Sequence, residues 1–169
     1  MDYAGTGTLV GAKPPSGCTD TNYGDTTGSG GNDLQLATYI YGRSITLGAA
    51  GTAQSISVYF GFIYSGPGDF QCALYTNASG SPDALVAVTE TINTNVASQY
   101  HTFDFATPPS VSATIYWAAI WGSKTIISSN SGRTFYDTNA WGGSWPDPMV
   151  EDVAAGTGET HDTYITVCI

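Results

Sequence analysis

Short stretches in which apolar and polar residues alternate recur along the chain. Ile, Val or Phe occupies every second position in 55–60 (SISVYF) and again in 164–169 (YITVCI). Successive side chains of a β-strand point to opposite faces, so this period of two predicts strands with one buried face. No segment sustains the apolar stripe and end signals of an amphipathic helix. The pattern therefore predicts an all-β chain.

Eight such stretches, separated by turn signals, are predicted as strands. They lie at 37–47, 53–63, 70–76, 84–91, 99–105, 115–121, 133–137 and 162–169. Gly, Pro, Asn and Asp cluster between them, as in SGPGD and NASGSPD, and these residues favour tight turns. Eight antiparallel strands with such loops predict a two-sheet β-sandwich of the jelly-roll type, and 169 residues suffice for one domain of this kind.

The first 33 residues are more polar than the rest. The run TDTNYGDTTGSGGND at 19–33 is predicted as a long irregular loop, because it holds few apolar side chains that could pack. Residues 1–33 are then expected to form an N-terminal strand and a long polar loop, packed on the single domain that spans 1–169. The candidate strand is 6–10 (TGTLV), which an edge strand of another copy could accept, leading to self-association.

The charge composition narrows the class of partner. Charged residues make up 11% of the chain, against about 25% in a typical domain, which is the profile of an extracellular or virion-surface β-protein. The chain has four basic and fourteen acidic residues. The resulting net charge of −10 repels nucleic acid and anionic membranes. Neutral sugars remain acceptable ligands and a bound cation is favoured, although the acidic excess could serve solubility only.

The location is expected to be extracellular, or on a cell or virion surface. No run of about 18 apolar residues exists, so membrane insertion is not expected. The first residues, MDYAGTGTLVGAK, lack the basic and apolar regions of a secretory signal. Either the chain is a module of a larger secreted protein, or it is assembled in a cytoplasm as a phage structural protein would be.

Three cysteines allow at most one internal disulfide. Cys72 shares a strand face with Phe70 and Leu74 and is predicted as a buried, inert thiol. Cys18 and Cys168 could tie the N-terminal loop to the last strand. No CxxC or Cys/His spacing predicts a zinc site.

Five motifs together resemble a known family. They are ISVYFG (56–61), GDFQCALYTNASGSPDALVA (68–87), HTFDF (101–105), IYWAAIWGS (115–123) and SWPDP (144–148). Their succession is similar to a jelly-roll module appended to secreted and surface proteins of bacteria and archaea. The resemblance implies the fold and a carbohydrate-binding or adhesive role, and it implies no catalytic residues. Two departures are Tyr100-His101, where the family carries a Trp, and the longer polar run at 19–33.

The candidate ligand site is RTFYDTNAWGGSWPDP at 133–148, which places large aromatic residues in a polar, Gly-rich segment. Aromatic faces stack on the C–H groups of a pyranose, and amides, carboxylates or an Arg bind its hydroxyls. The predicted ligand-binding residues are Trp121, Arg133, Tyr136, Asp137, Asn139, Trp141 and Trp145. Alternatively, Trp117 and Trp121 face into the sandwich and Trp145-Pro146 seals a loop. For Trp117 we expect burial, because YWAAIW alternates.

Calcium is a candidate structural cofactor. Asp20, Asn22, Asp25 and Asp33 bring hard oxygen ligands together on a Gly-rich segment that could wrap an ion. The likeness to sugar-binding jelly rolls adds Asp162, where the N-terminal segment would meet the last strand. The alternative is a solvated loop rich in Asx turns.

No catalytic template fits the chain, and we expect it not to be an enzyme. A glycosidase needs two carboxylates about 5 to 9.5 Å apart in a cleft. The sequence around Glu90, Glu151 and Glu159 contains no glycosidase motif. A Ser-His-Asp triad would need His101 or His161, and no GxSxG elbow is present. The favoured function is a non-catalytic module that binds a neutral polysaccharide. The alternatives are a structural subunit of a virion or extracellular filament, and then a small glycoside hydrolase or lyase.

Overall fold

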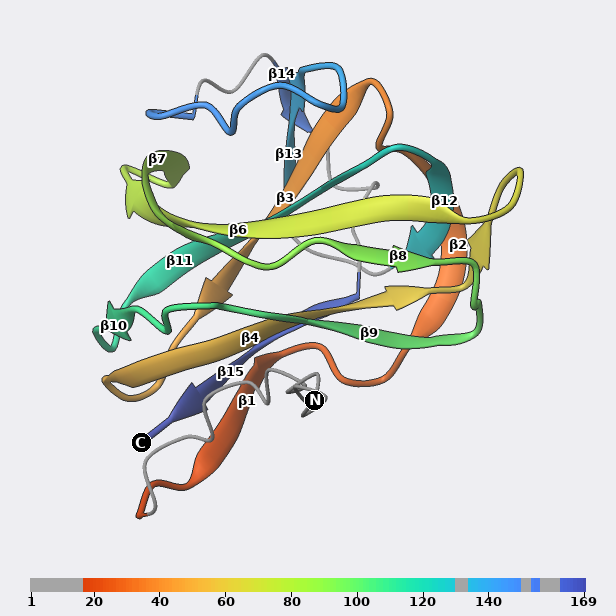
Figure 1. Cartoon of the computed structure of the whole chain (residues 1–169). Helices are drawn as coiled ribbons and strands as arrows, with labels where there is room; N and C mark the ends of the chain where they lie inside the picture. Colours follow the sequence, from red (N-terminus) through yellow and green to blue (C-terminus); the bar gives the residue numbers. More distant parts are fainter. Residues whose placement is uncertain (1–16, 130–133, 150–152, 156–161) are drawn as a thin grey trace, which may run out of the picture.

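The described residues of the computed structural model are 17–129, 134–149, 153–155 and 162–169, and they form β-strands without a helix (Figure 1). The strands are β1 (Asp20–Gly24), β2 (Ser29–Gln35), β3 (Tyr39–Thr46), β4 (Gly51–Phe60), β5 (Phe62–Ile63), β6 (Gly68–Ala78), β7 (Ser81–Val88), β8 (Ile92–Thr94), β9 (Gln99–Asp104), β10 (Ser110–Val111), β11 (Ile115–Gly122), β12 (Thr125–Ser129), β13 (Thr134–Thr138), β14 (Val153–Ala155) and β15 (Thr163–Cys168). The prediction of an all-β chain is confirmed.

The strands form two large antiparallel sheets and one small one. The five-stranded sheet has the order β1-β15-β4-β10, with β9 also paired to β4. The seven-stranded sheet has the order β14-β13-β3-β11-β6-β7, with β8 also paired to β6. The three-stranded sheet has the order β2-β12-β5. Figure 1 shows the two large sheets as layers, with β3, β6 and β11 above β4, β9 and β15, an arrangement consistent with a β-sandwich.

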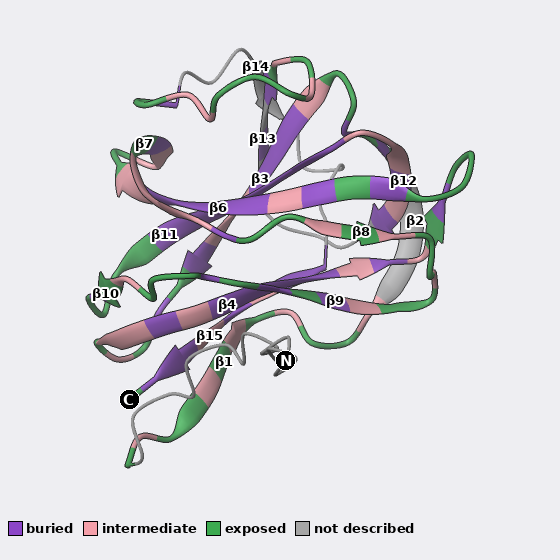
Figure 2. Cartoon of the chain, in the orientation of Figure 1, coloured by how far each residue is buried: buried purple, intermediate pink, exposed green. Residues whose placement is uncertain are grey.

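The main core fills the space between the two layers. Ile56, Val58 and Phe60 of β4 alternate inward as the sequence predicts, and Phe70 and Leu74 of β6 pack in the same cluster. Full burial of such side chains contributes about 1.5 to 3 kcal/mol each, which makes this layer the main source of stability. Figure 2 shows buried positions alternating with less buried ones along β4 and β6, whereas β11 is buried along nearly its whole length.

Cys72 lies in the same core. Its side chain is fully buried and forms no disulfide, as expected of an inert thiol. Burial raises the pKa of the thiol well above its ordinary value, because the thiolate would lose its hydration.

The eight predicted strands all correspond to observed ones, with one change that matters for function. The predicted strand 53–63 is two elements, because the chain leaves the five-stranded sheet after Phe60 and Gly61 bonds instead to β12. The Gly61 amide donates to the Ile127 carbonyl at 2.7 Å. Residues 62 and 63 therefore belong to the small sheet.

The prediction of an irregular loop at 19–33 is wrong. This segment contains β1, which pairs with β15, and most of β2, which pairs with β12. Strand pairing uses backbone groups, so a polar segment can form an edge strand whose outward side chains are solvated. Along β1, Asp20, Asn22 and Gly24 are exposed while Thr21 and Tyr23 are half-buried. The candidate exchange strand at 6–10 lies outside the described residues.

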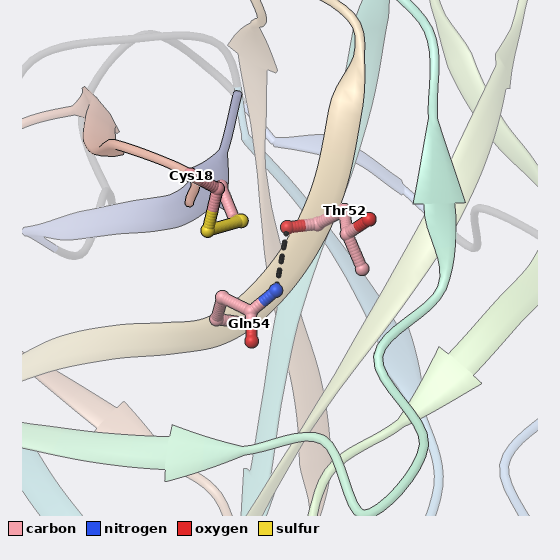
Figure 3. Close-up of a disulfide and its surroundings, with 4 residues drawn as sticks. Cys18, Thr52 and Gln54 are labelled. Carbon is pink, nitrogen blue, oxygen red and sulfur yellow. Dashed lines mark hydrogen bonds between the residues drawn. A yellow bond between two sulfur atoms is a disulfide. The ribbon is translucent and has the colours of Figure 1, made fainter. Parts of the chain in front are cut away.

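A disulfide ties β1 to β15. Cys18 and Cys168 are bonded, with their Cα atoms 5.4 Å apart and a separation of 150 positions in the sequence. Beside them, Thr19 and Ile169 exchange two backbone hydrogen bonds of 3.0 Å. Figure 3 shows the disulfide next to β4, where the Gln54 amide donates to the Thr52 carbonyl. The pairing considered from the sequence is confirmed, and such bonds persist in oxidising compartments.

Candidate functional site

A second aromatic cluster covers the outer face of the seven-stranded sheet. In β11 successive side chains alternate between the two faces, so that Trp117, Ala119 and Trp121 point away from the main core while Tyr116 and Ile120 point into it. Both sets are buried, which makes β11 a strand that is covered on both faces. The cluster also contains Ile40, Ala73, Tyr75, Phe135 and Met149. The expected burial of Trp117 is confirmed.

Glycine at position 42 allows the cluster to pack directly on the backbone of β3. A side chain at Gly42 would collide with the ring of Phe135, which pairs with Gly42 across β13 and β3. Phe135 in turn meets Trp117 edge to face, with ring centroids 5.4 Å apart. This contact fixes the position of β13, from which the candidate ligand segment continues.

The segment 139–149, here called the cap loop, covers this cluster. Backbone bonds hold its start, since the Asn139 amide donates to Thr38 at 2.9 Å and the Trp141 amide donates to Ala37 at 3.1 Å. At its end the Met149 amide donates to the Asp83 carbonyl at 3.0 Å. The Asp147 carboxylate accepts from the Leu85 amide at 3.0 Å. The cap loop is thus attached to the sheet along its length.

Tyr75 anchors the cap loop from below. Its hydroxyl donates to the Pro146 carbonyl at 2.9 Å. Burial raises the pKa of Tyr75 far above its ordinary value, and the carboxylates of Asp147 and Asp137 raise it further. The hydroxyl therefore stays protonated and remains a donor throughout the neutral range.

The indole N–H groups distinguish the four tryptophans. Trp117 donates to Asn77 Oδ1 at 3.0 Å, Trp121 to the Asn139 carbonyl at 3.0 Å, and Trp145 to Gln71 Oε1 at 2.7 Å. Trp141 Nε1 donates to no acceptor within the described part of the chain. Because indole N–H groups usually find a partner when buried, the half-buried Trp141 is the ring with a polar atom left for a ligand or water.

Two glycines let the cap loop pass over Trp121. Gly142 has φ of +98°, a conformation that favours glycine, and faces open space. A Cβ at Gly143 would lie 3.3 Å from the Trp121 ring. Trp141 and Trp145 both meet Trp121 edge to face, each with a centroid distance of 5.4 Å. The Gly-Gly pair thus allows two aromatic rings to converge on a third.

The structure separates the predicted ligand-binding residues into three groups. Trp141, Trp145 and Asn139 are half-buried on the cap loop. Trp121 is only 1% exposed, so the expectation that its ring meets a ligand needs correction: it supports the two rings above it. Asp137 is buried beneath the surface near Tyr75. Tyr136 is described by its backbone in β13, and Arg133 lies outside the described residues.

The predicted calcium ligands do not gather on one loop. Asp20 and Asn22 lie on the exposed side of β1, and Asp33 lies on β2 in another sheet. Asn22 Oδ1 accepts from the Thr166 hydroxyl at 2.9 Å. Asp162 is buried directly before β15. The wrapping loop expected for the ion is absent because the segment forms strands.

Asp25 follows β1 and uses its carboxylate locally. Partial burial raises its pKa, but hydrogen bonds from the Thr27 hydroxyl and amide outweigh this, so the pKa is lowered overall. Among the described residues, one group of three metal-ligating side chains lies within 4.8 Å, namely Cys18, Asp20 and Cys168. Its two sulfurs are bonded to each other, so it is not a metal site. Calcium binding therefore stays a prediction without a described cluster behind it.

His101 has a structural environment. Its ring is buried against Phe60, with centroids 4.6 Å apart, and Nε2 lies 2.8 Å from the Val96 carbonyl. These contacts account for both the apolar face and a polar atom of the imidazole. His161 lies outside the described residues.

The sequence reasoning missed a pair of exposed aromatic residues, Phe62 and Tyr64. Continuing the alternation of β4 would place Phe62 inward with Phe60, but the change of sheet at Gly61 places it outward. The available signal was Gly61 itself, followed by two aromatics and the turn SGPGD.

No sequence profile of a known protein family matches the chain, and no curated protein matches it. The resemblance to secreted jelly-roll modules therefore rests on the motifs in the sequence. In the part of the chain that the structure describes, no helix is long and apolar enough to cross a membrane.

Proposed function

We propose that this chain is a non-catalytic extracellular module that binds a neutral polysaccharide at the cap loop. Trp141 carries the proposal. Its ring is half-buried, packed edge to face on the buried Trp121, and its indole N–H has no acceptor among the described residues. An aromatic ring held in this way offers a sugar a fixed apolar face and one hydrogen-bond donor.

The surroundings of Trp141 support a neutral ligand. Gly142, Gly143 and Ser144 are exposed beside it, which leaves room for a pyranose ring, and the half-buried Asn139 offers an amide close in sequence. The acidic chain, with a net charge of −10, disfavours phosphorylated or sulfated ligands. Sugar hydroxyls bind to amides and carboxylates without a compensating positive charge.

We also propose that the fold is a jelly roll. The eight main strands are β1, β3, β4, β6, β7, β9, β11 and β15. Numbered one to eight along the chain, they give the orders 1-8-3-6 in one sheet and 2-7-4-5 in the other. Interleaving of this kind is what two Greek keys wound together produce, and it supports the proposal. The disulfide supports a secreted protein or one displayed on a cell or virion surface.

Affinity electrophoresis in gels that contain a soluble glucan, xylan or mannan tests the function. We expect at least one neutral polymer to retard the protein, and Trp141→Ala to weaken the retardation strongly. Ile115→Ala is the matched control, because Ile115 is an exposed apolar residue on β11 outside the cap loop. Unfolding curves confirm that both variants are folded.

Two results would count against the proposal. Equal retardation of wild type and Trp141→Ala would remove the cap loop from the binding site. Absence of retardation by every neutral polymer, together with fibres or particles seen by electron microscopy, would favour the structural subunit instead.

A further inference from the structure

The outer face of the three-stranded sheet presents a row of aromatic and apolar side chains to solvent. Asp33, Ile127 and Phe62 are aligned across β2, β12 and β5, and their neighbours Leu34, Ile126 and Ile63 are aligned one position further on. The second row is buried in the core, so the first row points outward. Phe62 is 49% exposed and Tyr64, two positions later on the same side, is 39% exposed. We call Phe62, Tyr64, Ile127 and Asp33 the aromatic face.

The aromatic face is held rigidly in place. The rings of Phe62 and Tyr64 are 5.1 Å apart and nearly perpendicular, at 80°. The Tyr64 hydroxyl reaches over β12 and donates to Asp33 Oδ1 at 3.2 Å. The Tyr64 amide donates to the Thr125 carbonyl at 3.0 Å, which fixes the backbone under the ring. Two exposed rings are therefore ordered before any ligand arrives, which lowers the entropy that binding must overcome.

We propose that the aromatic face is a second binding site, for a pyranose unit of the same neutral polysaccharide. The proposal rests on the proposed function and extends it to a separate surface. The rings supply an apolar platform, while Asp33 accepts hydrogen bonds from sugar hydroxyls and the exposed Gln35 on β2 can donate and accept them. The combination of apolar faces with polar groups at the edge matches the alternating C–H and O–H groups of a sugar.

Other occupants fit the aromatic face less well. A stable protein interface buries about 800 Å² on each partner. The exposed aromatic pair does not extend into a surface of that kind, because polar side chains on the neighbouring strand border it. A phosphate-bearing ligand would meet Asp33 and an acidic chain. The other large apolar residues that are exposed in the described part of the chain, Val96, Ile115 and Ile169, stand on other segments.

The position of the aromatic face gives the second site a consequence. In Figure 1 the turn between β4 and β6 lies at the far right, while the light-blue cap loop lies at the top left. Two separated sites on one domain engage a long polymer at two points, or join two polymer chains, and so add avidity that a short oligosaccharide does not gain.

The test compares a polymer with its own short oligosaccharide. The variants are the double substitution Phe62→Ala with Tyr64→Ala, the single substitution Trp141→Ala, and the double control Val96→Ala with Ile115→Ala. Affinity electrophoresis measures binding of the polymer that retards the wild type, and NMR titration measures binding of a short oligosaccharide of the same sugar. We expect the aromatic-face variant to lose about tenfold or more in polymer affinity while retaining its oligosaccharide site at the cap loop.

The outcomes separate the two proposals. If the aromatic-face variant binds the polymer as tightly as the double control and Trp141→Ala does not bind, the second site is wrong and the proposed function stands. If Trp141→Ala binds normally and the aromatic-face variant does not, the cap loop is wrong and the aromatic face is the site. If the aromatic-face variant instead turns a sedimenting dimer into a monomer without changing polymer affinity, the face joins copies of the chain and the proposal is overturned.

Discussion

The cap-loop cluster and the aromatic face both place aromatic rings on the outer side of a sheet, but only the first is covered. Trp121 is 1% exposed beneath the cap loop, whereas Phe62 is 49% exposed on the three-stranded sheet. Hydrogen bonds between the cap loop and the sheet also satisfy polar atoms. Asn139 of the cap loop accepts from the indole of Trp121, and Gln71 of β6 accepts from the indole of Trp145. On the aromatic face, the Tyr64 hydroxyl is bonded to an exposed carboxylate instead.

The difference shows what each set of rings does for the fold. Each Trp presents about 150 to 250 Å² of surface, so several of them outside a sheet require a cover, which the cap loop provides. Two smaller rings, Phe62 on the two-residue strand β5 and Tyr64 directly after it, can remain exposed without such a cover. Covered rings stabilise the structure and exposed rings are available for a ligand. Trp141 lies between these cases, because it belongs to the cover and still offers its N–H.

The strongest way to break this distinction is to truncate one ring in each region. Trp121→Ala should destabilise the protein by about 3 to 5 kcal/mol, because it leaves a cavity under the cap loop. Phe62→Ala should change the free energy of unfolding by no more than about 0.5 kcal/mol, as exposed positions usually do. Urea denaturation followed by circular dichroism measures both. Similar losses in the two variants would show that the regions do not differ in structural role.

Removing the disulfide tests whether the two regions depend on the attachment of β1. Cys18→Ser with Cys168→Ser should cost about 2 to 5 kcal/mol, because the unfolded chain regains the freedom of a loop of about 150 residues. Tryptophan fluorescence of the folded variant should be unchanged, since the four indoles contact β6, β11 and the cap loop. A shifted emission maximum below the unfolding transition would show that β1 also shapes the cap loop.

Much of the fold could be predicted because alternation reports directly on which face of a strand is buried. The exceptions have physical causes. β1 was missed because its pairing with β15 satisfies backbone groups and requires little apolar surface. The outward orientation of Phe62 was missed because the chain changes its sheet partner at Gly61, which resets the side of the strand that faces inward. Pairing partners are not visible in the local sequence.

The candidate site was predictable only in part. Alternation that buried Trp117 also places Trp121 on the same side of β11, so applying the rule to both rings would have predicted the burial of Trp121. The indole N–H groups of Trp117, Trp145 and Trp121 donate to Asn77, Gln71 and Asn139. Each of these acceptors is distant in sequence from the tryptophan that it binds. Only the folded arrangement shows that Trp141 is the indole left without one among the described residues.

A smaller perturbation asks whether the hydrogen bond of Trp145 contributes to the cover. Trp145→Phe keeps an aromatic ring against Trp121 and removes the donor to Gln71, and it should cost about 1 to 2 kcal/mol including lost packing. A double-mutant cycle with Gln71→Ala isolates the hydrogen bond, and we expect a coupling of about 0.5 kcal/mol or more. Additive effects would mean that the bond does not hold the cap loop.

The smallest expected effect concerns the titration of Tyr64 on the aromatic face. The hydrogen bond to Asp33 raises the pKa of Tyr64 above its ordinary value of 10.0, and partial desolvation and the negative charge of Asp33 act in the same direction. The protonated form is therefore favoured in the folded state, so this contribution to stability is present below about pH 10 and is lost as the pH rises through the folded pKa.

Asp33→Ala should move the pKa of Tyr64 back toward its ordinary value, because it removes both the acceptor and the charge. The tyrosinate absorbance of the protein, corrected with the same titration of Tyr64→Phe, isolates this one residue among eleven tyrosines. Tyr75 serves as the internal contrast: burial beneath the cap loop raises its pKa so far that it should titrate only as the protein unfolds. If Tyr64 titrates identically with and without Asp33, the bond that orders the aromatic face does not persist in solution, and the two rings lose the preorganisation that distinguishes them from scattered exposed residues.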